Sequence, residues 1–396
     1  MRKATLLPEL RIYHLFRAKE GPSPGGGSYQ VARRENGNSI PESTNRNCDR
    51  PDQEWNKKGS NQRPTKQIEM KALSLLSGGL DSILATKIIQ NQGIEVEGVS
   101  FTSPFFTADR AMEAAGSLGI LFHTEDIANE ILSLLKSPPH GFGKGTNPCI
   151  DCHIVMVKRA AALMPKIKAS FLITGEVLGE RPKSQNRWAL GVVEEESGWG
   201  NYLLRPLTAK NLAPTLPETK GWVNREKLLG IKGRSRRPQL KLASELGIKK
   251  FPTPAGGCLL TDPIFSQKLK DLLLRGKINH NEIELLRVGR HFRLGKNSRL
   301  IVGRNEKENK SLLELTTPDD FRLQVVSFQG PISLLRGEID DNTLLKAASI
   351  TCRYSDAPRD GATVVCYRVS GKEKKCLQVL PLEDEELGLL RTGRNV

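Results

Sequence analysis

The chain has 396 residues, enough for two or three domains, and 38% of them are hydrophobic, enough for a sizeable core. No apolar run approaches the roughly 20 residues of a membrane helix, and charged residues interrupt any signal peptide. We therefore expect a cytoplasmic protein with no membrane partner. The 60 Lys and Arg residues exceed the 44 Asp and Glu residues, a formal charge of +16. Such an excess favours nucleic acid as a partner, although a merely basic protein fits it equally well.

The first 69 residues are rich in Gly, Pro, Ser, Asn and charged side chains and show no sustained hydrophobic periodicity. Such a segment cannot bury enough apolar surface to order itself, so residues 1–69 are predicted to be a disordered leader. Met70 stands directly before the first strand-like run, which raises the alternative that the leader does not belong to the native protein.

From Lys71 onward, strand-like and helix-like segments alternate. Strands are expected at 72–76, 96–101, 120–122 and 171–174, and helices at 80–90, 108–118, 127–135 and 150–163. This alternation predicts an α/β domain with a doubly wound parallel sheet over residues 70–275. Later segments are helices at 239–246, 265–274 and 281–286, then strands at 300–302, 323–328 and 362–367. Residues 285–396 are therefore predicted to form a smaller α+β or β-rich domain.

A glycine-containing loop joins the first strand to the first helix, and its sequence is Ser77-Gly78-Gly79-Leu80-Asp81-Ser82. Glycines let successive N–H groups face one point, and the helix N-terminus adds its positive end, so the loop can bind phosphates. Its serines can donate hydroxyl hydrogen bonds, and Asp81 can hold Mg²⁺ on a released diphosphate. The loop lacks the Gly-Lys-Ser/Thr of P-loop kinases and the Gly-x-Gly-x-x-Gly of dinucleotide-binding folds. The alternative is an ordinary strand-to-helix turn with a serine cap.

The seven cysteines are Cys48, Cys149, Cys152, Cys258, Cys352, Cys366 and Cys376. An odd number in a chain without a secretion signal argues against a disulfide framework and for thiol or metal chemistry. The three in the C-terminal domain lack metal-ligand spacing, and we expect them to be core or surface thiols.

Cys149 and Cys152 form a Cys-x-x-Cys pair at the start of a predicted helix, where the helix dipole lowers a thiol pKa. Cys258 follows two glycines in a loop. Two thiolates from one motif and a distant third suit an iron–sulfur cluster with three protein ligands and one open iron. The sequence does not decide between a [4Fe–4S] and a [3Fe–4S] cluster. The alternatives are a persulfide on Cys149 or Cys258, a zinc ion with His153 as fourth ligand, and inert buried thiols.

The loop Ser-Gly-Gly-x-Asp-Ser after a first strand resembles that of the PP-loop ATP pyrophosphatases. Other motifs resemble those of the tRNA thiouridine synthases, in particular the relatives of 4-thiouridine synthase. These motifs are Asn147-Pro-Cys-Ile-Asp-Cys-His153, Thr174-Gly-Glu-Val-Leu-Gly-Glu-Arg-Pro-Lys-Ser-Gln185 and Pro254-Ala-Gly-Gly-Cys258. The resemblance covers about residues 70–275.

The resemblance implies that the loop grips the pyrophosphate of ATP while a uracil carbonyl attacks the α-phosphate. Sulfur then displaces the activated oxygen and AMP is released, so the chain is expected to be an ATP- and Mg²⁺-dependent tRNA sulfurtransferase. The implied catalytic residues are Asp81, Cys149, Cys152 and Cys258. Further partners are a sulfur donor, either a cysteine desulfurase or inorganic sulfide, and in one alternative a second copy of the chain.

Two more sets of residues are expected at binding surfaces. The strand-end loop places Gly175, Glu176, Arg181, Ser184 and Gln185 near the nucleotide. Basic stretches offer RNA contacts through Arg234, Arg236, Arg237, Arg290, Arg293, Arg299 and Arg304. The segment 299–315 also resembles the NFACT RNA-binding domain. The leader is too polar to form the ferredoxin-like and THUMP modules of the thiouridine synthases, so tRNA docking is expected to fall to the C-terminal half.

Two other functions fit part of the sequence. A PP-loop amidating ligase acting on a small molecule would use the phosphate loop, but it leaves the three cysteines and the basic stretches without a role. A non-catalytic RNA-binding protein would use the basic stretches and leave the loop vestigial. The sequence does not distinguish C2 from C4 of uracil as the site of thiolation.

Overall fold

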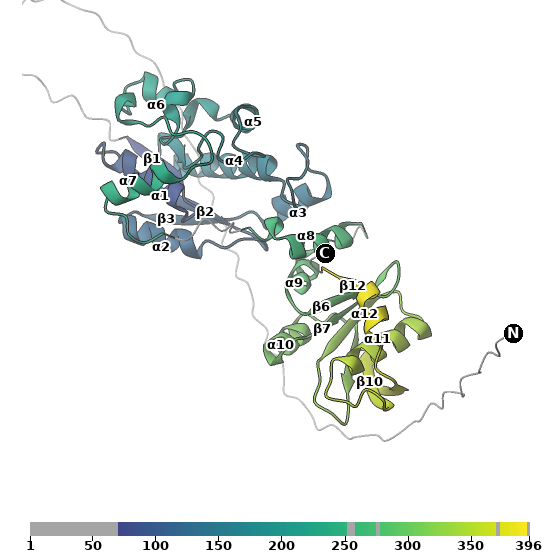
Figure 1. The fold of residues 1–396 in the computed structure, drawn as a ribbon. Helices are drawn as coiled ribbons and strands as arrows, with labels where there is room; N and C mark the ends of the chain where they lie inside the picture. The colour runs from purple at the N-terminus through teal and green to yellow at the C-terminus, as the bar shows by residue number, and fades with distance from the viewer. Residues whose placement is uncertain (1–69, 252–257, 275–277, 370–372, 394–396) are drawn as a thin grey trace, which may run out of the picture. The chain divides into compact units, whose positions relative to one another are not determined.

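The computed structural model describes residues 70–251, 258–274, 278–369 and 373–393 (Figure 1). The leader predicted for residues 1–69 lies outside this part of the chain, and so do residues 252–257, which include the glycine pair expected before Cys258. None of the helices within the described ranges combines the length with the apolar composition that a bilayer-crossing helix needs.

The first sheet is parallel, with its strands in the order β3-β2-β1-β4-β5. These strands are β1 (Lys71–Leu75), β2 (Glu95–Thr102), β3 (Phe122–Asp126), β4 (Phe171–Thr174) and β5 (Leu203–Leu204). The helices in the same stretch of chain are α1 (Leu80–Gln90), α2 (Asp109–Leu118), α3 (Ala128–Lys136), α4 (Cys149–Ile167), α5 (Arg187–Ser197), α6 (Leu216–Thr219) and α7 (Arg237–Glu245). The strand order reverses at β1, which confirms the predicted doubly wound sheet.

Each face of this sheet has its own hydrophobic core, because successive strand residues point to opposite faces. Leu73 of β1 packs with α3, α4 and α5 on one face. Ala72, its neighbour, packs with α1 and α7 on the other. With both faces covered by apolar side chains, the carboxyl ends of the strands are where polar chemistry is expected in a fold of this kind.

The third strand lies further along the chain than the predicted 120–122, since β3 begins at Phe122. The apolar residue Ile120 instead helps to end α2. Gly119 adopts a left-handed conformation with a φ of 66°, and the N–H of Ile120 donates to the carbonyl oxygen of Ala115 over 3.1 Å. This is the hydrogen-bond pattern of a helix C-terminus, and it takes the first apolar residue of the segment out of the strand.

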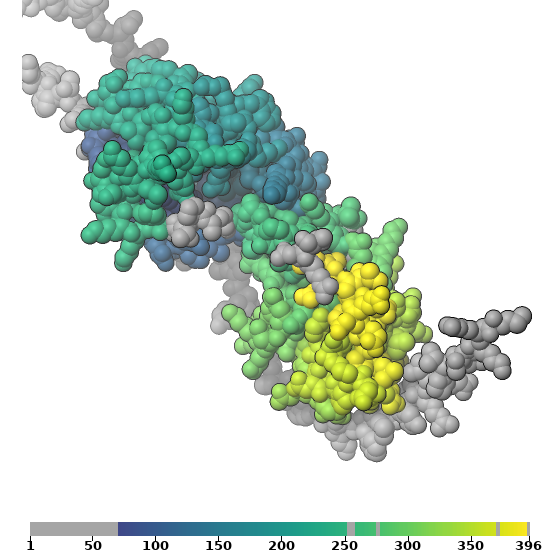
Figure 2. Space-filling view, in the orientation of Figure 1, coloured from purple at the N-terminus to yellow at the C-terminus, as the bar shows by residue number. Residues whose placement is uncertain are grey.

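The second sheet is antiparallel, in the order β11-β10-β8-β9-β7-β6-β12. Its strands are β6 (Arg290–Arg293), β7 (Ser298–Val302), β8 (Phe321–Val325), β9 (Ser333–Gly337), β10 (Thr363–Val369), β11 (Lys375–Val379) and β12 (Arg391–Thr392). The helices from residue 263 onward are α8 (Pro263–Leu273), α9 (His280–Arg287), α10 (Glu306–Glu314), α11 (Asp341–Arg353) and α12 (Asp384–Leu390). Figure 2 shows the atoms of this C-terminal part of the chain in light green to yellow. The predicted β-rich or α+β character of the C-terminal segment is confirmed.

Two of the C-terminal cysteines do not remain thiols, contrary to the prediction. Cys366 on β10 stands directly opposite Cys376 on β11, and a disulfide joins them. Facing positions on neighbouring antiparallel strands bring two side chains close together, which the cysteine count does not reveal. Cys352, on α11, is a free thiol in the core, as expected.

Candidate nucleotide and sulfur site

The loop between β1 and α1 is already folded into a turn. Gly78 has a φ of 73°, and Gly79 directly precedes the first turn of α1. Ser77 Oγ donates to Ser82 Oγ over 3.2 Å, and Ser82 Oγ donates to the carbonyl oxygen of Gly79 over 2.8 Å. These bonds brace the turn, whereas the N-cap residue Gly79 supplies no side-chain cap. The N-cap is thus a glycine and not the serine of the alternative interpretation, and the N–H groups of the first turn of α1 can bind an anion.

Replacing Gly78 with alanine is expected to damage this turn. A Cβ at this position would lie 2.4 Å from the backbone of Arg110, and the positive φ adds strain. We expect a loss of about 2–3 kcal/mol in the free energy of unfolding and weaker binding of pyrophosphate. Urea denaturation and calorimetric titration would measure both. Gly93→Ala is the matched control, because Gly93 has a φ of 81° and nothing within 4 Å of the added Cβ. Equal costs for the two variants, with unchanged pyrophosphate affinity, would contradict the expectation.

The end of β4 lies directly against the first turn of α1. A Cβ on Gly175 would come within 2.4 Å of the backbone nitrogen of Ser82, so only glycine fits between these two backbones. Ser184 and Gln185 are buried in the loop that follows, whereas Arg181 is exposed. The structure therefore places the end of β4, where the strand-end loop begins, beside the phosphate loop.

Asp81 meets two charged groups that are distant in the sequence. Arg236 Nη2 lies 3.3 Å from Asp81 Oδ2, and Arg236 Nε lies 4.0 Å from Glu180 Oε1. Burial raises the pKa of Asp81 above its ordinary value, although Arg236 and Arg181 act in the opposite direction. Arg236, which was predicted to contact RNA, thus lies at the phosphate loop. Glu180 was missed, and its only signal in the sequence was its place inside the strand-end motif.

Glu176 is the centre of a buried network behind the loop. Its carboxylate accepts hydrogen bonds from Arg205 Nε at 2.8 Å, His153 Nδ1 at 2.9 Å and Thr174 Oγ1 at 3.1 Å. Burial alone would raise the pKa of Glu176, but the Arg205 guanidinium and His153 outweigh it and hold that pKa well below the ordinary value. Arg205 had no role in the sequence-based prediction, and His153 appeared there only as the fourth ligand of the alternative zinc site. For Arg205, the only signal in the sequence was its place directly after a short apolar run.

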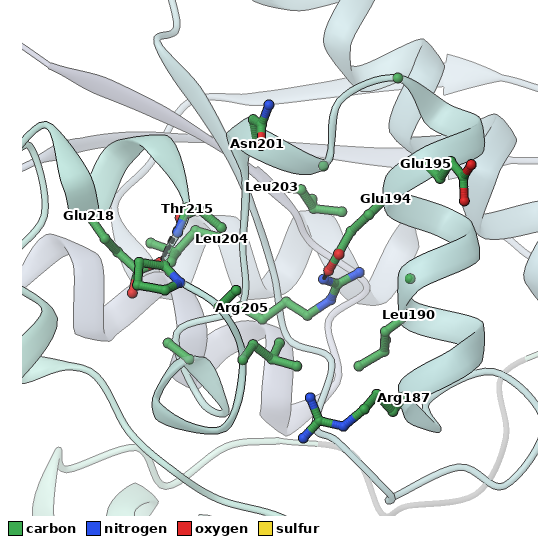
Figure 3. Close-up of a pocket in the computed structure, with 17 residues that line it drawn as sticks. Arg187, Leu190, Glu194, Glu195, Asn201, Leu203, Leu204, Arg205, Thr215 and Glu218 are labelled. Carbon is green, nitrogen blue, oxygen red and sulfur yellow. Dashed lines mark hydrogen bonds and ion pairs between the residues drawn. The ribbon is translucent and has the colours of Figure 1, made fainter.

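A cavity of about 600 Å³ lies beside this network, between α5 and the segment leading to α6 (Figure 3). Arg205 reaches into it toward Glu194, with which it forms an ion pair. Arg205 Nη2 is buried and has no hydrogen-bond partner within the described ranges. Glu195 and Glu218 add negative charge to the walls and Arg187 adds positive charge, so the lining favours neither sign of ligand.

The three cysteines of the predicted cluster lie close enough to influence one another. Burial raises the pKa of Cys152 well above its ordinary value, and charge on Cys258 and Cys149 adds to the effect. Burial likewise raises the pKa of Cys258 to about 11, with a further contribution from Cys149. The prediction that the helix N-terminus lowers the pKa of Cys152 is therefore wrong, because the effect of burial on this pKa is larger. The side chain of Asn147 donates to Cys149 Sγ over 3.0 Å.

Within the described residues, no three His, Cys, Asp or Glu side chains converge closely enough to hold a single metal ion. His153, the proposed fourth ligand of a zinc ion, is bound to Glu176 instead. A cluster differs from a single ion, because each of its irons takes its own thiolate and the sulfurs are spread more widely.

The arginines predicted to contact RNA fall into different environments. Arg234 and Arg237 are exposed. Arg290 lies over the ring of Tyr354 at 4.6 Å, and exposed Arg304 pairs with Glu308. Arg293 is exposed and pairs with Asp271, whereas Arg299 is buried and pairs with Glu282.

A glycine turn at the carboxyl end of β1, in a parallel sheet whose strand order reverses there, is the arrangement of an α/β domain of the PP-loop class. Comparison with known families agrees. Residues 67–211 match the family described as thiamine biosynthesis protein (ThiI), and residues 289–389 match the NFACT protein RNA binding domain. Both resemblances predicted from the sequence are confirmed.

Similar proteins include the probable tRNA sulfurtransferase of Geobacillus sp. (strain WCH70), 29% identical over 148 residues, which are 35% of each chain. The probable tRNA sulfurtransferase of Caldanaerobacter subterraneus subsp. tengcongensis is 33% identical over 119 residues, 28% of this chain and 30% of that one. The match thus spans about one third of these relatives. A solved 4-thiouridine synthetase–RNA complex with bound ATP is 20% identical, and the match covers 45% of this chain and 52% of that one with a TM-score of 0.29.

Proposed function

We propose that the chain is an ATP-dependent tRNA sulfurtransferase. It adenylates a carbonyl oxygen of a uridine in tRNA, releases pyrophosphate and replaces that oxygen by sulfur. One observation supports this proposal above all: a short series of contacts joins the phosphate loop to the thiols. Ser82 of the loop touches Gly175, the adjacent Glu176 binds His153, and His153 follows Cys152 on α4.

In the first step the uracil carbonyl oxygen attacks the α-phosphorus of ATP, and the bond from that phosphorus to the β-phosphate oxygen breaks. The leaving pyrophosphate gains negative charge. The N–H groups of the turn at Gly78 and Gly79 and of the first turn of α1 are oriented before the reaction and stabilise that charge. Asp81 would hold Mg²⁺, which neutralises the phosphates when bound. In the second step sulfur attacks the carbon, the carbon–oxygen bond breaks and AMP leaves with the oxygen.

The three cysteines fit the sulfur half of this chemistry. They are partly buried, they influence each other's protonation, and Cys152 and Cys258 pack against the same core. We infer that Cys149, Cys152 and Cys258 hold an iron–sulfur cluster, whose open iron would supply a binding position for sulfide. A persulfide on Cys149 or Cys258 is the second reading of the same arrangement. Inorganic sulfide can supply the sulfur to a cluster directly, whereas a persulfide needs the sulfane sulfur that a cysteine desulfurase delivers.

The RNA partner is proposed from the C-terminal match and from the exposed basic side chains. An NFACT-type segment over residues 289–389 gives the chain an RNA-binding part. Exposed Arg234 and Arg237 can reach a phosphate backbone from the surface, and so can Arg304 if it leaves Glu308. A charge of +16 attracts RNA over a distance.

Mass spectrometry of tRNA nucleosides tests the proposal. A strain that lacks this chain is expected to lose one thiolated uridine, and the chain supplied in trans should restore it. An unchanged thionucleoside profile would remove the function. Iron and sulfide assays on anaerobically purified protein test the cofactor separately. Iron and sulfide in the protein, and their loss in Cys258→Ala, support the cluster, whereas an iron-free protein that still makes the thionucleoside favours the persulfide.

A further inference from the structure

One residue of the basic segment has a position that RNA contact does not explain. Arg236 stands between Arg234 and Arg237, which are both exposed, yet its own side chain is only 23% exposed. Its guanidinium lies between two carboxylates, 3.3 Å from Asp81 Oδ2 and 4.0 Å from Glu180 Oε1. It therefore faces the phosphate loop and not the surrounding solvent.

The backbone fixes this position. Lys232 pairs with Leu178 in a parallel bridge, and the N–H of Gly233 donates to the carbonyl oxygen of Leu178 over 2.8 Å. On the other side, Gln239 is fully buried on α7, and its side chain lies 3.4 Å from Glu180. Both flanks of Arg236 are thus attached to the strand-end loop. This attachment distinguishes it from a flexible surface arginine.

The negative charges around Arg236 are unfavourable for the binding of ATP, which is itself negatively charged. Asp81 and Glu180 bring two carboxylates to the edge of a loop that must receive a polyanion. Arg236 neutralises part of this charge through its contacts with both carboxylates. Asp81 Oδ1 is buried and has no hydrogen-bond partner among the residues that the structure describes. Asp81 therefore has an oxygen available for a cation other than the guanidinium.

We propose that Arg236 is a phosphate-binding residue that exchanges partners. It holds Asp81 when the loop is empty, and it donates to phosphate oxygens of ATP once Mg²⁺ occupies Asp81. A guanidinium suits this role, because its planar N–H groups match two phosphate oxygens at once. The inference rests on the proposed use of ATP and removes Arg236 from the set of RNA contacts.

Calorimetric titration with Mg²⁺-pyrophosphate tests whether Arg236 binds phosphate. Arg236→Ala is expected to weaken binding by about 10- to 100-fold, which is typical of a charge-assisted hydrogen bond, and Arg236→Lys to recover part of the loss. Binding to tRNA should stay at the parent value. Lys241→Ala is the matched control, since Lys241 is an exposed cation on the same region of α7 and pairs only with Glu245 among the described residues. Unchanged pyrophosphate affinity in Arg236→Ala, or a loss confined to tRNA binding, would overturn the inference.

Titration with metal-free pyrophosphate tests whether Asp81 and phosphate compete for Arg236. In Asp81→Asn the guanidinium is released from its carboxylate partner, so binding of metal-free pyrophosphate in EDTA is expected to strengthen by about tenfold. The double variant Asp81→Asn/Arg236→Ala should lose this gain. No strengthening in Asp81→Asn, or a gain that survives in the double variant, would contradict the exchange. If the parent protein binds neither pyrophosphate nor ATP, the proposed function itself fails, which is a different result from the failure of Arg236 alone.

Discussion

Replacement of Cys258 by alanine is expected to lower thionucleoside formation by at least about 100-fold. A loss of this size is typical when a residue that carries the transferred group is removed. Pyrophosphate release in the presence of tRNA should remain within about threefold of the parent value, because the phosphate loop is untouched. The physical reason is the proposed division of the site, in which α1 and its loop would act on ATP while α4 and Cys258 would act on sulfur. Nucleoside mass spectrometry and a coupled pyrophosphate assay measure the two halves.

Cys352→Ala is the control for this experiment, because Cys352 is a free cysteine that packs in the core of the C-terminal sheet. Both activities should persist in it. Two outcomes would contradict the division of roles. If Cys258→Ala thiolates tRNA at the parent rate, Cys258 does not handle sulfur and the three-cysteine cluster is ruled out. If it loses pyrophosphate release to the same extent as thiolation, Cys258 belongs to the activation step.

The second large effect is expected at the buried ion pair of Glu176 and Arg205. Arg205→Met should lower the free energy of unfolding by about 3–5 kcal/mol, because it leaves the Glu176 carboxylate buried without its cation. The Arg205 side chain is 1% exposed, so water cannot replace the lost partner. Arg159→Met is the matched control, since Arg159 is 43% exposed and pairs with Glu125, and we expect it to cost about 0–1 kcal/mol. Urea denaturation measures both variants.

The same pair predicts how stability depends on pH. The pKa of Glu176 is lower in the folded state than in the unfolded state, where it has its ordinary value. Its contribution is therefore complete above the ordinary value and is lost as the pH falls below it. Arg205→Met should remove this part of the acid dependence. In the double variant Arg205→Met/Glu176→Leu, most of the stability should return, because neither charge is then buried alone. A double variant no more stable than Arg205→Met would count against the ion pair as the cause.

Local patterns in the sequence were enough to predict the phosphate turn. Glycines between a buried strand and a helix leave few alternatives, and α1 begins and ends at the predicted residues. The end of β4 was likewise predicted, because a short apolar run followed by Gly175 has the length of a buried strand. These features depend on neighbours in the chain, which is why hydrophobic periodicity and turn residues reveal them.

Contacts between distant residues could not be predicted in this way. Arg236 and Asp81 are separated by 155 positions, and nothing in the basic segment distinguishes Arg236 from Arg234. Arg205 is buried in a core, and only the three-dimensional structure shows that the carboxylates of Glu176 and Glu194 balance its charge. The position of Cys152 at a helix start predicted a lowered pKa, but burial among surrounding residues raises the pKa instead.

Products of ATP in the presence of unmodified tRNA test the central claim most directly. With ATP labelled at the α-phosphate and a sulfur donor, the account predicts AMP and pyrophosphate in equal amounts, with one thiolated uridine formed for each AMP. Formation of ADP and inorganic phosphate, or of AMP without dependence on tRNA, would contradict it.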